Sequence, residues 1–239
     1  MKNILSYDEI DSTNAEAKRL LRGEYSGDEL YGVIVTARKQ TAGRGRLGRS
    51  FASPGGDSVY ASFILKPPEH PAEQRITAFA AVAVCLAIEK TTSYKPGIKW
   101  INDILVDGKK ICGILAESVQ GAVVLGIGIN INLEEDDLPV ELRDAAGSLQ
   151  IDKDTRERFF KTLIEEVFCY MTVAEKPDLM DEYRTRSVLL GKPVNIGSDS
   201  IPAFCEGIAG DGALIVRYEN GSTEELRSSE ISVRLASGS

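Results

Sequence analysis

Hydrophobic and polar residues follow helical spacing in four segments of the chain. The first helix is expected from Ser12 to about Leu21, because Thr13 and Glu16 fit the capping-box pattern and Gly23 can end it. The second is rich in alanine and apolar throughout, which is typical of a buried helix. The other two are amphipathic. These three later helices are predicted over 71–92, 154–172 and 177–186.

Short runs rich in valine and isoleucine predict strands between these helices. Asp107 and Gly108 separate two of the runs, and Asp-Gly between apolar runs is the strongest short-range signal of a hairpin. Because strands and helices do not alternate regularly, an α+β fold with a mixed sheet fits better than a doubly wound one. The strands are expected at 31–37, 58–65, 97–100, 104–106, 111–118 and 121–130.

The pattern changes after residue 190, where short strands separated by glycine-containing turns replace the mixture of helices and strands. About 50 residues of this kind predict a small antiparallel barrel. We therefore expect two domains, at 1–189 and 190–239. The strands of the second are predicted at 191–196, 203–208, 214–218, 223–226 and 231–235.

The composition is ordinary for a globular protein, with 239 residues of which 43% are hydrophobic and 27% charged. No apolar run approaches the roughly 20 residues of a membrane span, and the first residues lack the apolar core of a signal peptide. We therefore expect a cytoplasmic protein that binds no membrane. The formal net charge of -8 argues against non-specific DNA binding.

Cysteine and histidine usage argues against metal-based and histidine-based sites. Cys85, Cys112, Cys169 and Cys205 form no CxxC pair, so neither a zinc site nor a disulfide framework is indicated. All four are expected to be small buried apolar residues. His70 is the only histidine and lies among prolines, which argues against a histidine-based triad.

One segment is strongly basic although the chain as a whole is acidic: residues 38–56 carry five cations and no carboxylate. Its like charges repel, and its glycines lose much backbone entropy on ordering, so a strongly anionic ligand would offset both costs. The alternative is a solvated loop or an RNA-binding tail. The sequence GRGRLG at 43–48 also matches the dinucleotide fingerprint, but turn residues rather than a helix follow it. The segment therefore indicates an anion-binding loop of another kind.

Five short motifs follow one another along the chain: STN (12–14), Gln40 with GRGR (43–46), KWIND (99–103), KICGIL (110–115) and GIGIN (126–130). Together they resemble the biotin–protein ligase family, over nearly the full chain and including an SH3-like C-terminal barrel. The resemblance implies an enzyme that uses ATP and Mg²⁺ to activate biotin as biotinyl-5′-AMP. It then implies transfer of biotin to one lysine of a biotin carboxyl carrier protein.

The same resemblance sets expectations about other partners. Because the motifs begin almost at Met1, we expect no N-terminal helix-turn-helix and no DNA binding. An unpaired strand at a sheet edge can serve a homodimer or the acceptor protein, and the residues do not decide between them. Two other functions stay open: a lipoate–protein ligase, whose arginine-rich pattern with a GGG run is missing here, and a non-enzymatic nucleotide-binding module.

The resemblance implies a biotin pocket with polar and glycine-rich walls. Hydroxyl and amide side chains can bind the ureido ring of biotin, whose donors and acceptors need partners once buried. Thr13 has an alternative role as a helix cap. The glycines let the backbone approach the ligand. The implied biotin-binding residues are Ser12, Thr13, Asn14, Gln40, Gly43, Arg44, Gly45, Arg46, Lys110, Gly113, Gly126 and Gly128.

The resemblance also implies an adenylate site, where fixed cations suit a reaction that brings a carboxylate to the α-phosphate. Phe51 can cover the adenine or pack into the core, and Asn130 can instead be a turn residue at a strand end. The implied adenylate-binding residues are Arg44, Arg46, Arg49, Phe51, Lys99, Asn102 and Asn130.

Arg44, Lys110 and Asp103 are the implied catalytic residues. Strand alternation alone leaves open whether Lys109 or Lys110 points into the site; the family pattern of a lysine two residues ahead of Gly-Ile-Leu selects Lys110. Asp103 is expected to bind Mg²⁺ or to orient the incoming lysine amine. Ile101 stands where many family members have proline, which alters the local turn but removes no functional group.

Overall fold

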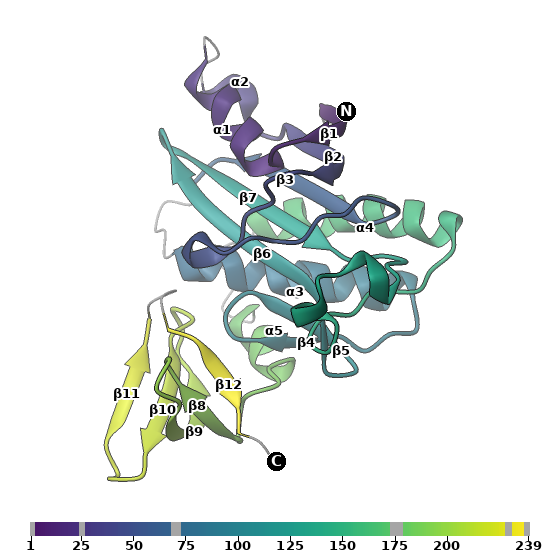
Figure 1. Ribbon diagram of the computed structural model, residues 1–239. Coiled ribbons are helices and arrows are strands. Elements are labelled where there is room, and N and C mark those ends of the chain that lie inside the picture. Colours follow the sequence, from purple (N-terminus) through teal and green to yellow (C-terminus); the bar gives the residue numbers. More distant parts are fainter. Residues whose placement is uncertain (1–2, 24–26, 68–72, 173–178, 228–230, 237–239) are drawn as a thin grey trace.

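The computed structural model describes residues 3–23, 27–67, 73–172, 179–227 and 231–236. Two sheets organise it, one of seven strands and one of five (Figure 1). Among the described helices, none is long and apolar enough to cross a membrane. His70 and the first residues of the helices predicted over 71–92 and 177–186 lie outside the described residues.

The seven-stranded sheet has the order β1-β2-β3-β7-β6-β5-β4. Its first two strands are parallel and its other pairs are antiparallel, which confirms the predicted mixed sheet. The edge strand β1 was not predicted, because most of its residues are exposed and show no alternation of burial. The strands are β1 Ile4–Ile10, β2 Ile34–Gln40, β3 Val59–Leu65, β4 Gly97–Lys99, β5 Asp103–Val106, β6 Lys109–Val119 and β7 Ala122–Ile129.

Helices cover both faces of this sheet. Alternate strand residues face opposite sides: Phe63 and Leu125 pack in the core with α3 and α4, whereas Ile64 and Val124 pack in a smaller cluster with α1. The helices are α1 Thr13–Arg22, α2 Gly27–Leu30, α3 Glu73–Thr91, α4 Lys153–Thr172 and α5 Leu179–Thr185, with 3₁₀ turns at Arg46–Gly48, Glu135–Asp137 and Val140–Leu142.

The start of α1 differs from the predicted capping box. Ser12 is the N-cap, and its side chain accepts a hydrogen bond from the backbone N–H of Ala15 at 3.4 Å. Thr13 is the first residue of the helix, so its hydroxyl does not cap it. The capping role expected for Thr13 is therefore wrong, and the neighbouring Ser12 has it instead. Serine and threonine are both good capping residues, so the sequence alone does not separate them.

The predicted hairpin at Asp107 and Gly108 is confirmed. Both residues have positive φ, 50° and 77°, as a two-residue type I′ turn requires. The turn joins β5 to β6 and thereby brings Lys110 opposite Leu105. It places two neighbouring lysines at the start of a strand that crosses the site.

Three of the four cysteines are buried as expected, but Cys169 on α4 is exposed, so that prediction is wrong for this residue. Burial raises the pKa of Cys85 to about 12 and that of Cys205 to about 11, and it raises the pKa of Cys112 well above the ordinary value. The buried thiols are therefore neutral packing groups.

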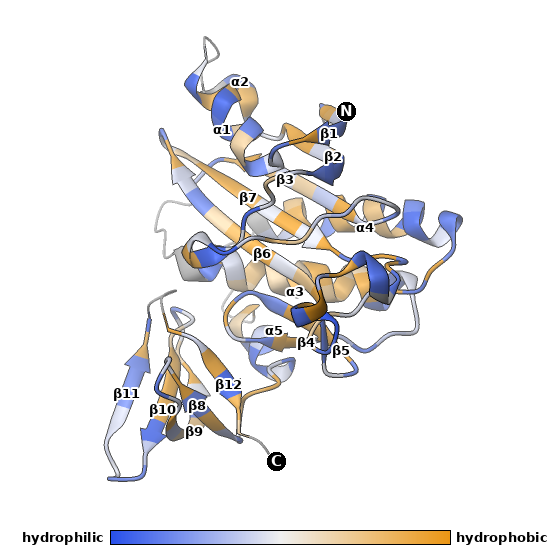
Figure 2. Cartoon of the chain, in the orientation of Figure 1, coloured by the Kyte–Doolittle hydropathy of each residue, from blue (hydrophilic) through white to orange (hydrophobic). Residues whose placement is uncertain are grey.

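The five-stranded antiparallel sheet has the order β11-β10-β9-β8-β12. Its edge strand β11 is mainly hydrophilic, in contrast to the hydrophobic β3 and β7 (Figure 2). The sheet packs on the first part of the chain, where Trp100 Nε1 donates to the carbonyl of Gly212 at 2.9 Å. The domain division at residue 190 stays a prediction. The strands are β8 Pro193–Ile196, β9 Ile201–Ile208, β10 Leu214–Tyr218, β11 Thr223–Leu226 and β12 Val233–Leu235.

Candidate active site

A cavity of about 210 Å³ lies on the face of the large sheet that α1 leaves partly uncovered. The basic loop after β2 and residues 231–234, which lead into β12 of the small sheet, complete its walls. The structure brings all but two of the expected site residues to this cavity. Those that line it are Ser12, Thr13, Asn14, Gln40, Arg44, Gly45, Arg46, Arg49, Phe51, Lys99, Asn102, Asp103, Lys110, Gly113, Gly126 and Gly128.

Neutral polar side chains gather at one end of the cavity. Gln40 at the end of β2 uses its Oε1 to accept the backbone N–H of Thr13 at 2.8 Å, and its Nε2 donates to Ser53 at 2.9 Å. The Thr13 hydroxyl lies 2.8 Å from that of Ser62, which is itself 2.6 Å from Asn14 Oδ1. These side chains are held by several hydrogen bonds each, so their positions are fixed without a ligand.

The basic loop forms a tight turn over the cavity. The N–H of Gly45 donates to the carbonyl of Arg49 at 2.7 Å, and the N–H of Phe51 donates to the carbonyl of Gly43 at 2.9 Å. Leu47 at the tip has φ of 60°, a conformation that an L-residue adopts at some cost. The turn therefore holds Arg44, Arg46 and Arg49 at the cavity wall.

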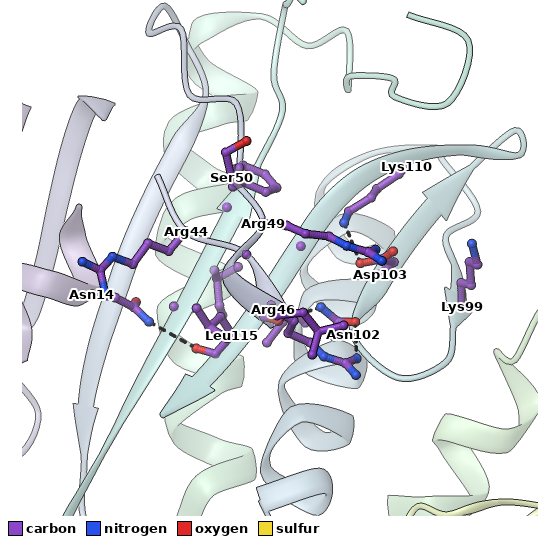
Figure 3. A pocket seen from close by; sticks show the side chains of 18 of the residues that line it. Asn14, Arg44, Arg46, Arg49, Ser50, Lys99, Asn102, Asp103, Lys110 and Leu115 are labelled. Carbon is purple, nitrogen blue, oxygen red and sulfur yellow. Dashed lines mark hydrogen bonds and ion pairs between the residues drawn. The ribbon is translucent and has the colours of Figure 1, made fainter. Parts of the chain in front are cut away.

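Arg46 reaches from this loop to the β4–β5 turn. Its Nη1 donates to Asn102 Oδ1 at 2.7 Å, while Asn102 Nδ2 donates to the carbonyl of Ile114 at 2.9 Å (Figure 3). Burial lowers the pKa of Arg46 and nearby Asp103 opposes this, but a guanidinium stays charged at any physiological pH. Asn102 thus links the loop to the sheet through a fixed cation.

Lys110 and Asp103 form an ion pair across β5 and β6, with Nζ 2.7 Å from Oδ1 (Figure 3). The neighbouring Lys109 does not line the cavity; its Nζ donates to the carbonyl of Arg143 at 3.4 Å. The choice that strand alternation left open is therefore made by the geometry, with Lys110 at the cavity. Among the described residues that line it, Asp103 is the only carboxylate.

Lys99 lies beside this pair in a strongly positive environment. Burial lowers the pKa of Lys99; Asp103 opposes this effect, whereas Lys110, Arg234 and Arg49 add to it. Bringing several cations together around one carboxylate is unfavourable unless an anion binds between them. The cationic end of the cavity is therefore suited to phosphate groups.

Phe51 forms part of the cavity wall between the two ends. Its ring meets that of Tyr60 edge to face, with centroids 6.4 Å apart, and Lys110 Nζ lies 6.0 Å from its centroid. A Cβ at Gly128 would lie 2.6 Å from the ring, and one at Gly113 would lie 2.9 Å from it. The ring therefore packs on the sheet where two strands lack side chains.

Comparison with known proteins agrees with this geometry. The model of the biotin/lipoate A/B protein ligase family matches residues 9–134, and the model of the biotin protein ligase C terminal domain matches residues 189–234. The chain belongs to the biotin protein ligase family. A biotin--[acetyl-CoA-carboxylase] ligase of Paracoccus denitrificans is 33% identical over 231 residues, covering 88% of this chain and 92% of the relative.

Two further relatives bear on length and fold. The bifunctional ligase/repressor BirA of Bacillus spizizenii is 41% identical over 155 residues, which cover 62% of this chain and 46% of that protein. The match thus spans about half the length of that relative. A structure of the Aquifex aeolicus biotin protein ligase in complex with biotin and ATP superposes with a TM-score of 0.84 at 28% identity, covering 99% of this chain and 100% of that one.

Two residues that the family resemblance assigned do not line the cavity. Gly43 lies at the base of the loop, where a Cβ would be 2.4 Å from the carbonyl oxygen of Phe51. Asn130 is buried and donates to the carbonyl of Gly147 at 2.9 Å, while its Oδ1 has no hydrogen-bond partner among the described residues. Their ligand-binding roles stay predictions.

Other residues line the cavity that were not expected there. Residues 231–234 reach it from the small sheet, where they lead into β12, and Tyr60 lies in its wall. The segment at 230–234 reads EISVR and resembles a family motif, which was the available signal; Glu230 lies outside the described residues. Within the described residues there is no cluster of three or more histidine, cysteine or acidic side chains suited to a metal.

Proposed function

We propose that the chain is an ATP-dependent biotin–protein ligase that forms biotinyl-5′-AMP and transfers biotin to one lysine of a biotin carboxyl carrier protein. The observation that carries this proposal is the division of one cavity into two chemically different ends. Thr13 and Gln40 offer hydrogen-bonding groups at one end, and Arg49, Lys99 and Lys110 offer cations at the other. A cyclic urea with a carboxylate tail fits the first, and a nucleotide fits the second.

The proposed reaction has two displacement steps. A carboxylate oxygen of biotin attacks the α-phosphorus of ATP, and pyrophosphate leaves. The lysine amine of the carrier protein then attacks the acyl carbon of this mixed anhydride, and AMP leaves. Both steps gain from fixed positive charge where two anions meet, and neither needs an enzyme nucleophile.

The residues of the cationic end take separate roles in this proposal. Arg46, held by Asn102 at 2.7 Å, and Lys110 neutralise the reacting carboxylate and phosphate. Asp103 keeps Lys110 in place through the 2.7 Å ion pair. The Mg²⁺ that enters with ATP would share Asp103 with the phosphates, since magnesium takes one or two carboxylates together with phosphate oxygens.

The first experiment detects the proposed intermediate. The protein is incubated with biotin and MgATP, and biotinyl-AMP is measured by mass spectrometry; a parallel reaction contains lipoate in place of biotin. Biotinyl-AMP with no lipoyl-AMP supports the proposal. Lipoyl-AMP alone would favour the lipoate ligase, and ATP binding without either adenylate would favour the non-enzymatic module.

The second experiment tests the acceptor. A purified biotin carboxyl carrier domain is added to the preformed adenylate, and the mass of the domain is followed. The expected result is one added biotinyl group on one lysine. A matched carrier domain with that lysine changed to arginine should gain no mass. Equal modification of both domains would contradict a specific acceptor lysine.

A further inference from the structure

A chain of hydrogen bonds reaches the polar end of the cavity from residues behind its wall. Lys18 on α1 pairs with Glu117 Oε1, and Glu117 Oε2 accepts from Asn14 Nδ2 at 2.8 Å. Ser62 Oγ then lies 2.6 Å from Asn14 Oδ1 and 2.8 Å from Thr13 Oγ1. Thr13 and Asn14 line the cavity, whereas Lys18, Glu117 and Ser62 do not.

The carboxylate of Glu117 decides which way the protons of this chain point. A carboxylate only accepts, so Asn14 must direct its Nδ2 toward Glu117 and its Oδ1 toward Ser62; the carbonyl of Leu115, 3.5 Å from the same Nδ2, is a second and more distant acceptor that favours the same orientation. The amide oxygen of Asn14 cannot donate, so Ser62 uses its single hydroxyl proton to donate to Asn14. In the contact between Ser62 and Thr13, the Thr13 hydroxyl must then be the donor and Ser62 the acceptor.

This direction leaves two acceptors side by side at the cavity. Three contacts, of 2.6, 2.8 and 3.1 Å, share the two hydroxyl protons of Ser62 and Thr13, so we assign the contact without a proton to the longest one, between Thr13 Oγ1 and Gln40 Oε1. The orientation of the Gln40 amide is fixed, because its Oε1 accepts the N–H of Thr13 and its Nε2 donates to Ser53. Thr13 is 4% exposed, so water reaches this pair poorly. A ligand N–H placed against both oxygens would satisfy them.

We propose that Lys18 and Glu117 are positioning residues that hold the polar end of the cavity in a hydrogen-bond-accepting state selective for a ligand N–H. The proposal rests on the proposed function, in which the ligand is biotin and the N–H belongs to its cyclic urea. Neither residue touches the ligand. Glu117 sets the direction of the chain, and Lys18 keeps the Glu117 side chain in place.

A neutral amide at position 117 would allow the opposite direction. Asn14 could then turn and donate to Ser62, giving up only its 3.5 Å contact with the carbonyl of Leu115. Ser62 would donate to Thr13, and Thr13 would donate to Gln40. The two oxygens at the cavity would satisfy each other, and a ligand N–H would gain less from binding there. The shape of the cavity would be nearly unchanged, because glutamine and glutamate have the same size.

The test is steady-state adenylate formation by the full chain carrying Glu117→Gln. We expect the KM for biotin to rise about 10- to 100-fold, the range for a buried hydrogen bond that is no longer made. We expect kcat and the KM for ATP to change by less than about threefold. The matched variant Lys18→Met keeps the carboxylate at position 117, so its biotin KM should rise less.

Analogue discrimination separates positioning from a general structural role. The probes are two biotin analogues in which one or the other ring N–H is replaced by oxygen. Wild-type protein should prefer biotin over at least one analogue, and Glu117→Gln should lose most of that preference.

Several results would overturn the proposal. One is a Glu117→Gln protein with an unchanged KM for biotin and an unchanged preference for biotin over the analogues. Another is an equal rise of the KM values for biotin and for ATP together with a lower Tm. If Glu117→Gln does not fold, the biotin KM and the discrimination are measured in Lys18→Met, where unchanged values of both also overturn the proposal. A wild-type protein that forms no biotinyl-AMP would instead reject the proposed function itself.

Discussion

Substituting Lys110 by alanine removes the cation that pairs with Asp103 and leaves the fold nearly intact. At 2.7 Å two unit charges attract by about 1.5 kcal/mol in water and about 6 kcal/mol at an effective dielectric constant of 20. The side chains are 37% and 23% exposed, so solvent screening and side-chain entropy reduce the net contribution of the pair to stability to about 1 kcal/mol. The free energy of unfolding should therefore change little.

The effect on catalysis should be much larger, because Lys110 faces charge that develops during the reaction. Losing one preorganised donor or cation typically lowers kcat about 10²- to 10³-fold, or about 2.7–4 kcal/mol. Lys110→Ala also leaves Asp103 unpaired beside two anionic substrates. Adding Asp103→Asn should recover about tenfold if Asp103 serves to hold Lys110. If Asp103 binds Mg²⁺, the double variant should be no faster than the single one.

The assay is biotin-dependent exchange of pyrophosphate into ATP, with thermal denaturation to verify folding. Lys109→Ala is the matched control, because the Lys109 side chain donates to the carbonyl of Arg143 outside the cavity. It should exchange at close to the wild-type rate. A wild-type rate in Lys110→Ala, or an equal loss in Lys109→Ala, would refute the reasoning.

Three further outcomes follow from the same structure. Because burial lowers the pKa of Lys99, the lysine loses its charge at a lower pH than an arginine would. The value of kcat/KM for ATP should therefore fall at a lower alkaline pH in the wild type than in Lys99→Arg, and the same alkaline limb in both pH profiles would contradict this. Trp100→Phe removes the donor to the carbonyl of Gly212, which should cost about 1–3 kcal/mol of unfolding free energy by chemical denaturation, whereas an unchanged value would mean that water replaces the indole N–H. Trypsin should cleave the basic loop at 44–49 more slowly when biotin and ATP are both present, since ligand anions hold its arginines; equal cleavage with and without them would argue against ordering of the loop on binding.

Elements set by local pattern could be predicted from the sequence. The buried helix around Ala83 and the hairpin at Asp107 and Gly108 follow from an apolar helical run and from a turn that requires positive φ at both residues. The edge strand β1 could not be predicted in this way. Its residues are mostly exposed, and parallel pairing with β2 rather than an apolar pattern holds it in the sheet.

Site residues could be predicted where a family motif specifies the position. Lys110 needed the motif, since Lys109 is its neighbour on a strand and periodicity cannot choose between them. The hydrogen bonds that orient Asn14 could not be predicted, because Glu117 lies 103 positions away and Ser62 lies 48 away in the sequence. Contacts of this kind depend on the strand order, which local patterns do not specify.

Three glycines on adjacent strands show how the sheet itself shapes both ends of the cavity. Gly113 and Gly128 face each other across β6 and β7, and the ring of Phe51 lies against both. A Cβ at Gly126 would lie 2.2 Å from Asn14 Oδ1, closer than side chains approach one another. The expected role of these glycines was close approach of the ligand. The protein's own side chains already require them, so a substitution at position 126 or 128 would disturb Asn14 or Phe51 before any ligand arrives.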